Sequence, residues 1–103
     1  MSIGQINKLI DSDGKRVVDI LLSPEADVPW HLHSALVEYC YCLSGQLDLE
    51  KEGCEPITLR PGEHCEVPIC IPHRLVNRSR SDCRFLIVQN GSYYDFVKVK
   101  KRD

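Results

Sequence analysis

The sequence predicts an all-β protein that folds as a single domain. Its apolar residues fall in short runs that alternate with polar positions or are rich in β-branched side chains, a pattern typical of strands. Turn-forming residues, above all glycine, proline, asparagine and aspartate, separate these runs at close intervals. The 103 residues contain no helical periodicity, no internal repeat and no interdomain linker. Roughly nine or ten short strands of this kind indicate a β-sandwich or a closed barrel of the jelly-roll type.

The N-terminal half is expected to form strands that are separated by clear turn signals. An apolar stretch at residues 6–10 is followed by Asp-Ser-Asp-Gly at 11–14, and then by residues 16–22, which are rich in β-branched side chains. Residues 23–29 contain two prolines and two acidic residues, and we expect a loop there. Further strands are predicted at residues 30–33, 38–43, 46–50 and 55–59, with turns at Ser44-Gly45 and Glu52-Gly53.

Prolines and glycines also divide the C-terminal half. Arg-Pro-Gly at residues 60–62 is a predicted turn, and the stretches 68–72 and 78–82 are predicted to connect strands. Asn90 and Gly91 are a further turn signal. Strands are expected at residues 64–67, 74–77, 84–89 and 93–100. The last of these alternates and carries aromatic residues, which fits an edge strand or a strand at a dimer contact.

Metal-binding side chains gather in the segment 30–45. His31 and His33 are two residues apart, so both imidazoles point to one face of an extended strand. Glu38 follows after a stretch long enough to bring a carboxylate back toward that face. Two imidazoles and a carboxylate on one side of a metal leave positions open for substrate, water or dioxygen, and His73 is a candidate fourth ligand. Alternatively, the His-x-His pair consists of surface or hydrogen-bonded residues on a half-buried strand.

The spacing of these residues resembles the first motif of the cupin family, which runs from a glycine through His-x-His and a glutamate to a second glycine. His31, His33, Glu38 and Gly45 match this motif over residues 31–45. The leading glycine is absent, because the preceding segment reads Pro-Glu-Ala-Asp. The resemblance therefore rests on the ligand positions and the closing glycine.

Residues 62–77 resemble the second cupin motif, in which glycine, proline, glycine, histidine and asparagine recur at fixed spacing. The matching positions are Gly62, Pro68, His73 and Asn77. Cys70 stands where the motif has its second glycine. Glycine is often required where the backbone has a positive φ or lies close to another segment. Cys70 is therefore either a tolerated turn variant or a thiol at the mouth of the barrel.

By this resemblance the chain is expected to be one cupin domain over residues 1–103, folded as a double-stranded β-helix, which is a jelly-roll barrel. A divalent transition metal is expected inside it. The implied ligands are His31, His33, Glu38 and His73. Iron, manganese, nickel, copper and zinc all suit this donor set. The family habit of pairing barrels, together with the strand predicted at 93–100, leads us to expect a homodimer.

Strand alternation nominates further residues for the pocket: Cys40, Cys42, Asn77 and Gln89. The two cysteines fall on the same face as Glu38, and as thiolates they would favour zinc or a softer metal. Filling of the core by small apolar side chains is the simpler interpretation. Asn77 could instead bond a turn or a backbone group, and Gln89 could be a satisfied edge residue. His64 is interpreted as a surface histidine.

Composition narrows the classes of partner and the compartment. A formal charge of −2 and a pI near 6.1 give no electrostatic reason to expect nucleic acid or an anionic membrane. No apolar run approaches the roughly 18 residues that span a bilayer. Six cysteines without a recognisable signal peptide favour reduced thiols and a cytoplasmic location.

Three functions suit these features. The first is a metal-dependent enzyme acting on a small organic molecule, with isomerase or dioxygenase chemistry favoured. The second is a module that binds a small, sugar-like or carboxylate ligand without catalysis, and the third is a structural cupin. The stretches PHRLVN at 72–77 and FLIVQNGSYYD at 85–95 also resemble cupins that isomerise sugar phosphates, such as the mannose-6-phosphate isomerase domain. In that family a metal binds the oxygens of the sugar.

Overall fold

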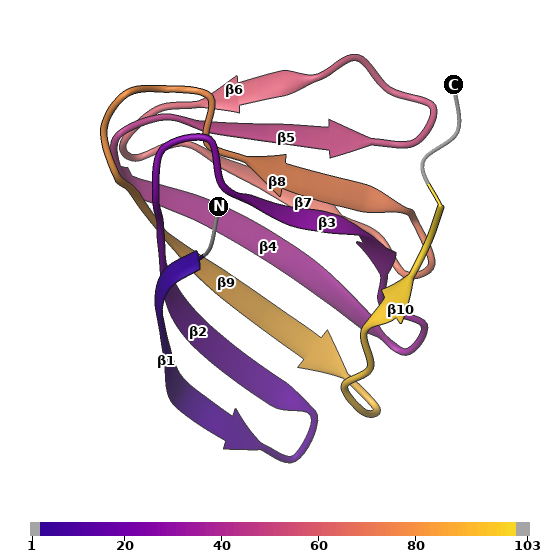
Figure 1. Cartoon of the computed structure of the whole chain (residues 1–103). Helices are drawn as coiled ribbons and strands as arrows, with labels where there is room; N and C mark the ends of the chain where they lie inside the picture. Colours follow the sequence, from indigo (N-terminus) through magenta and orange to yellow (C-terminus); the bar gives the residue numbers. More distant parts are fainter. Residues whose placement is uncertain (1–2, 101–103) are drawn as a thin grey trace.

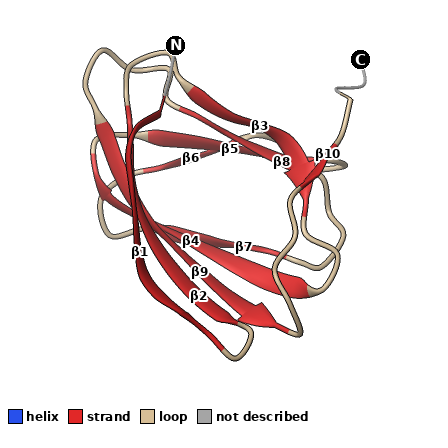
Figure 2. Ribbon diagram, turned by 60° about the horizontal axis from the view of Figure 1, so that its bottom comes forward, coloured by secondary structure: helices blue, strands red, loops and turns tan. Residues whose placement is uncertain are grey.

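Two antiparallel sheets of five strands each face one another across the molecule (Figures 1 and 2). A computed structural model describes residues 3–100, and within them every regular element is a strand. The first sheet contains, in spatial order, β1 (Ile3–Ser12), β2 (Lys15–Leu22), β9 (Cys83–Gly91), β4 (Leu36–Ser44) and β7 (His64–Val67). The second contains β10 (Val97–Lys98), β3 (Asp27–Leu32), β8 (His73–Val76), β5 (Leu47–Lys51) and β6 (Ile57–Leu59). The prediction of an all-β jelly-roll barrel is confirmed.

Along the strands of the first sheet, the inner face changes from apolar to polar. On β2, Leu22 and Ile20 belong to the apolar core, whereas Arg16, on the same face, lines a cavity. On β9 the corresponding residues are Phe85, which is fully buried in the core, and Gln89, which lines the cavity. Because side chains at every second position share a face, one end of the barrel is filled by apolar residues and the other is left for polar ones.

Strand β3 begins earlier than the sequence indicates. It starts at Asp27, inside the segment expected to be a loop, and it includes Pro29. A register shift between Val28 and His31 interrupts its pairing with β8 at that proline. Proline lacks a backbone N–H, so it is tolerated where the ladder is already broken by a bulge.

The predicted strand at 93–100 is wrong in extent. Regular pairing with β3 is limited to Val97 and Lys98, with one further hydrogen bond from the Val99 N–H to the Trp30 carbonyl at 3.1 Å. The chain crosses from β9 in one sheet to β10 in the other without regular structure (Figure 1). Asp95 decides this path, because its carboxylate accepts hydrogen bonds from the backbone N–H of Ser34, at 2.8 Å, and from the Ser34 hydroxyl. Tyr94 and Phe96 of this segment line the cavity, and the segment does not form a long edge strand. No helix in the described residues has the length and apolar character needed to cross a membrane.

Asn77 lies at the apolar end of the barrel, beyond β8, and not at the cavity. Its Nδ2 donates hydrogen bonds to the carbonyls of Leu22, at 2.9 Å, and Ser81, at 2.8 Å. Its Oδ1 accepts from the backbone N–H of Ser79, at 3.0 Å, and from the Ser79 hydroxyl, at 2.7 Å. The side chain is fully buried, so it links β2 to the loop that leads into β9. Of the two roles considered for Asn77, these contacts match the structural one.

We predict that Asn77→Ala destabilises the protein by about 2–4 kcal/mol, because it leaves the buried carbonyl of Leu22, the carbonyl of Ser81 and a turn N–H without their partner. The free energy of unfolding would be measured by urea titration. Asn90→Ala is the matched control: Asn90 is exposed on β9, and its loss should cost no more than about 0.5 kcal/mol. Equal losses in the two variants would contradict a structural role for Asn77.

Candidate metal centre

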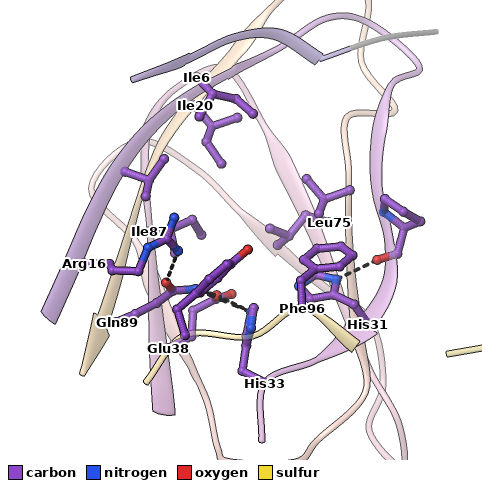
Figure 3. A pocket seen from close by; sticks show the side chains of 14 residues that line it. Ile6, Arg16, Ile20, His31, His33, Glu38, Leu75, Ile87, Gln89 and Phe96 are labelled. Carbon is purple, nitrogen blue, oxygen red and sulfur yellow. Dashed lines mark hydrogen bonds and ion pairs between the residues drawn. The ribbon is translucent and has the colours of Figure 1, made fainter. Parts of the chain in front are cut away.

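Three histidines and a glutamate from both sheets converge at the polar end of the barrel, and Figure 3 shows His31, His33 and Glu38 of this cluster. His31 on β3 pairs directly with His73 on β8, and His33 follows the end of β3. One ring nitrogen from each of these imidazoles lies within 4.8 Å of the others. Glu38, on β4 in the facing sheet, places Oε1 at 3.1 Å from His33 Nε2 and Oε2 at 3.2 Å from His73 Nε2. All four side chains are buried, so the structure brings together the residues that the two motifs nominated.

Backbone carbonyls fix the orientation of all three imidazoles. Each ring places its Nδ1 within hydrogen-bonding distance of a main-chain oxygen. The pairs are His31 with Pro29 at 2.6 Å, His33 with Asp95 at 2.6 Å, and His73 with Ile71 at 2.9 Å. Because a carbonyl can only accept, each Nδ1 carries the proton, and each neutral ring is left with a lone pair on Nε2. This tautomer is the one that binds a metal through Nε2.

Two atoms at the centre of this cluster lack a hydrogen-bond partner. They are Oε2 of Glu38 and Nε2 of His73, which are both buried. The 3.2 Å between them is an ion-pair distance, but the contact lacks hydrogen-bond geometry. A carboxylate oxygen and a neutral Nε2 both offer lone pairs, and a buried acceptor without a donor is costly. A cation bound between them would satisfy both, so the residues present fit a divalent transition metal.

Burial and close contacts set the charges of the cluster. Burial, together with the neighbouring His73, lowers the pKa of His31 to about 4, so this ring is neutral at neutral pH. Burial alone would raise the pKa of Glu38, but the contacts with His33 and His73 outweigh it and hold that pKa below its usual value. Burial works against the charged form of His33 as well, yet the hydrogen bond to Glu38 leaves its pKa raised. The carboxylate is therefore ionised and ready to bind a cation.

His31, His33 and Glu38 of the cluster form one wall of a cavity of about 220 Å³. The other lining residues are largely apolar, and Gln89 and Arg16 add polar groups (Figure 3). Gln89 donates from Nε2 to Glu38 Oε1 at 2.7 Å, so it lies in direct contact with the cluster. The lining residues are Ile6, Arg16, Val18, Ile20, Val28, Pro29, His31, His33, Glu38, Leu75, Ile87, Gln89, Tyr94 and Phe96.

Aromatic residues of the crossing segment 92–96 cover the histidines. Phe96 stacks on His31, with ring centroids 4.1 Å apart and an interplanar angle of 11°. Tyr94 lies 5.7 Å from His33, measured between ring centroids. These residues and Arg16 were missed by the sequence analysis. The aromatic pair was assigned to an edge strand, whereas the alternation of Arg16 with the buried residues of β2 was a usable signal.

The cysteines nominated for the pocket lie in the core and do not line the cavity. Cys40 and Cys42 point inward from β4 and are fully buried. Burial, with the nearby charge of Glu38, raises the pKa of Cys40, and burial also raises that of Cys42. Neutral thiols of this kind behave as small apolar side chains. Cys70 is exposed and has a φ of 65°, the backbone conformation that the glycine of the motif would adopt.

Comparison with known proteins identifies the family and the fold. A model of the cupin domain matches residues 18–89, which is well over half of the chain. An uncharacterised protein with a double-stranded β-helix domain from Klebsiella pneumoniae superposes with a TM-score of 0.84 at 16% identity, covering 98% of this chain and 90% of its own. No curated protein sequence matches the chain.

Two enzymes are also among the similar structures. A recombinant oxalate oxidase in complex with glycolate has a TM-score of 0.80 at 17% identity, covering 91% of this chain and 54% of its own. The DMSP lyase of Ruegeria pomeroyi has a TM-score of 0.75 at 25% identity, covering 84% of this chain and 46% of its own. The present chain thus spans about half the length of either enzyme, and the likeness to the oxidase is one of fold.

We predict that protonation of His31 destabilises the metal-free protein in acid. In the unfolded chain this histidine takes up a proton near pH 6.5, but in the folded protein only near pH 4. Between these values the unfolded state binds more protons, so stability falls as the pH falls. Urea unfolding of the wild type and His31→Gln, both in chelator, would measure this. The difference in the free energy of unfolding between the wild type and His31→Gln should be constant above about pH 7. As the pH falls toward about 4, the wild type should lose stability relative to the variant. A difference that did not change with pH would contradict the lowered pKa of His31 in the folded protein.

Proposed function

The chain is a member of the cupin family, and on that basis we propose that it holds a divalent transition metal and uses it to bind a small organic molecule inside the barrel. The proposed ligands are His31, His33, Glu38 and His73. The observation that carries this proposal is the shared tautomer of the three histidines, whose Nδ1 protons are taken by backbone carbonyls. In the neutral rings, three Nε2 lone pairs then converge near one ionised carboxylate whose Oε2 has no hydrogen-bond partner, and a cation would satisfy these acceptors.

The donor set favours a transition metal and leaves its identity open among iron, manganese, nickel, copper and zinc. Such an ion, when bound with open coordination positions, supplies a Lewis acid or activates dioxygen or water. The protein residues would orient the ligands and exclude water from the site. Gln89 donates a hydrogen bond to the carboxylate of Glu38, and the partly exposed Phe96 stacks on His31.

The cavity favours chemistry at the metal, or simple binding, over an isomerisation that needs a separate base. Among the lining residues that the structure describes, Arg16 and Tyr94 are the only ionisable side chains outside the proposed ligands. Neither is an imidazole or a carboxylate, the groups that most often act as the general base. Of the two predicted reactions, dioxygenase chemistry is therefore better supported than isomerisation. Binding without catalysis is the second candidate function.

Known cupin structures are compatible with a small ligand. The similar structures include an oxalate oxidase, a DMSP lyase and a sugar phosphate isomerase from Silicibacter pomeroyi, each of which is named for a small organic substrate. The cavity here, at about 220 Å³, suits a molecule smaller than the usual occupants of ligand pockets, which fill roughly 300–1,000 Å³.

We predict that His31→Ala and His73→Ala each lower metal affinity at least about tenfold, because each removes one donor. Elemental analysis of protein purified without added metal or an affinity tag should show stoichiometric metal in the wild type and little in either variant. His64→Ala is the matched control: this exposed histidine stacks on Tyr41, away from the cluster, and its removal should leave metal content unchanged. Circular dichroism would check that all the variants keep their β-structure. Unchanged metal in both ligand variants would refute the ligand set.

A homodimer is proposed as well, but on different grounds from the predicted terminal strand, which is too short to support one. The supporting feature is β1, an edge strand of ten residues whose backbone pairs only with β2 in the described part of the chain. Ile6, Leu9 and Ile10 expose 54%, 58% and 52% of their surface on this strand. A long edge with exposed apolar side chains is a surface that a second copy could cover.

We predict that size-exclusion chromatography with light scattering gives a dimer mass at micromolar concentration, and that Leu9→Lys shifts it toward the monomer because it places a charge on the edge. Leu43→Lys is the control, since Leu43 is exposed to a similar degree, 45%, on β4. A wild-type protein that eluted as a monomer would remove this proposal without affecting the metal site.

A further inference from the structure

We propose that Arg16 is the anion-binding residue of the cavity and holds the carboxylate of a short 2-hydroxy or 2-oxo acid, whose second oxygen lies at the metal centre. This inference rests on the proposed function, because it places one end of the ligand at the cluster of histidines. It adds the substrate class, which neither the motifs nor the family membership supplies.

The sheet register puts Arg16 beside the cluster. In the first sheet Arg16 on β2 is paired with Gln89 on β9, and Gln89 is paired with Glu38 on β4. The three side chains lie on the inner face at one level of the barrel (Figure 3). Arg16 Nη1 donates to Gln89 Oε1 at 2.7 Å, and Gln89 Nε2 donates to Glu38 Oε1 at 2.7 Å. One amide group therefore separates the guanidinium from the carboxylate of the proposed metal site.

The protein does not satisfy this guanidinium. The side chain of Arg16 is 13% exposed, and its Nε is buried without a hydrogen bond. The nearest carboxylate oxygen, from Asp11 on the exposed β1 edge, is 3.7 Å from Nε. Asp11 is itself about half exposed and is shared with Lys8, whose Nζ lies at 3.4 Å. The guanidinium of Arg16 is therefore largely buried, with Gln89 as a neutral partner and Asp11 as a distant, solvated anion. It can still bind an anionic ligand.

Tyr94 fixes the direction in which the guanidinium can act. The centre of the Arg16 guanidinium lies 3.6 Å from the centroid of the Tyr94 ring, which covers one of its flat faces. Gln89 occupies one N–H on its edge. A guanidinium held in this way recognises a planar anion through the N–H groups of its edge, as in bidentate pairs with carboxylates. Within the described lining it is the only permanent cation, so it determines which charge the cavity accepts.

The remaining walls limit the size of the ligand. A cavity of about 220 Å³ is smaller than the usual ligand pocket of roughly 300–1,000 Å³. Between the polar groups the walls are aliphatic, and Ile20, Ile87 and Leu75 are among them (Figure 3). A short acid fits this distribution: its carboxylate meets Arg16, its neighbouring oxygen meets the metal centre, and its carbon atoms contact the aliphatic walls.

A purely structural role for Arg16 must be distinguished from ligand binding. In that alternative Arg16 only orients Gln89, which in turn orients Glu38. Loss of Arg16 would then weaken every ligand that binds the metal, whether or not it carries a charge. An anion-binding role instead makes the loss specific to the carboxylate, so a charged ligand and its uncharged isostere separate the two roles.

The experiment is isothermal titration of protein loaded with Zn²⁺, which is redox-silent, with glycolate, glycolamide and inorganic phosphate. Glycolate should bind the wild type at least about tenfold more tightly than glycolamide. Arg16→Met should weaken glycolate about 10- to 100-fold, the loss expected for a charge-assisted hydrogen bond, and leave glycolamide within about twofold. Arg16→Lys keeps the charge without the planar edge, so its affinity for glycolate should lie between those of the wild type and Arg16→Met. It serves as the test if Arg16→Met does not fold.

Arg84→Met is the matched control, because Arg84 pairs with Asp19 outside the cavity and its loss should change neither affinity. Zinc content, measured on every variant, should not change. Equal weakening of glycolate and glycolamide would overturn the inference in favour of a positioning role, and a preference for phosphate over glycolate would overturn the proposed substrate class. Zinc binding without glycolate binding would refute this inference alone, whereas a wild type that binds no metal would refute the proposed function.

Discussion

The site depends on hydrogen bonds between imidazole Nδ1 atoms and backbone carbonyls. His31, His33 and His73 each have one, and the carbonyls come from β3, from the crossing segment and from the loop before β8. Main-chain oxygens can only accept, so the path of the chain determines which nitrogen carries the proton in each neutral ring. The fold therefore determines which imidazole nitrogens are free to bind a metal.

The division of the barrel into an apolar end and a polar end follows from the pairing of its strands. The same inner face carries Phe85 and Leu22 at one end and Gln89 and Arg16 at the other, so core and cavity share their strands. The polar row from Arg16 through Gln89 to Glu38 crosses three neighbouring strands at one level. Each polar side chain in this row contacts the next, which limits the cost of placing them inside the barrel.

Local patterns carried most of what could be predicted from the sequence. The period of two that places His31 and His33 on one face is a local property, and so is the alternation that defines most strands. The partnership of Arg16 with Gln89 is not local, because it joins residues 73 positions apart through the pairing of β2 with β9. The extent of the last strand was wrong for a similar reason, since the distant contact between Ser34 and Asp95 overrides the local alternation.

The crossing segment 92–96 both lines the cavity and orients a histidine of the cluster. Through Tyr94 and Phe96 it limits the width of the cavity, and through the carbonyl of Asp95 it holds the ring of His33. A bulkier occupant that pushed this segment outward would also withdraw the acceptor that keeps His33 in its metal-binding tautomer. Because such coupling is reciprocal, cavity width and metal retention are linked. Variants that evolve to admit larger molecules through this wall would thus have to compensate with a new acceptor for His33, or else bind the ion more weakly.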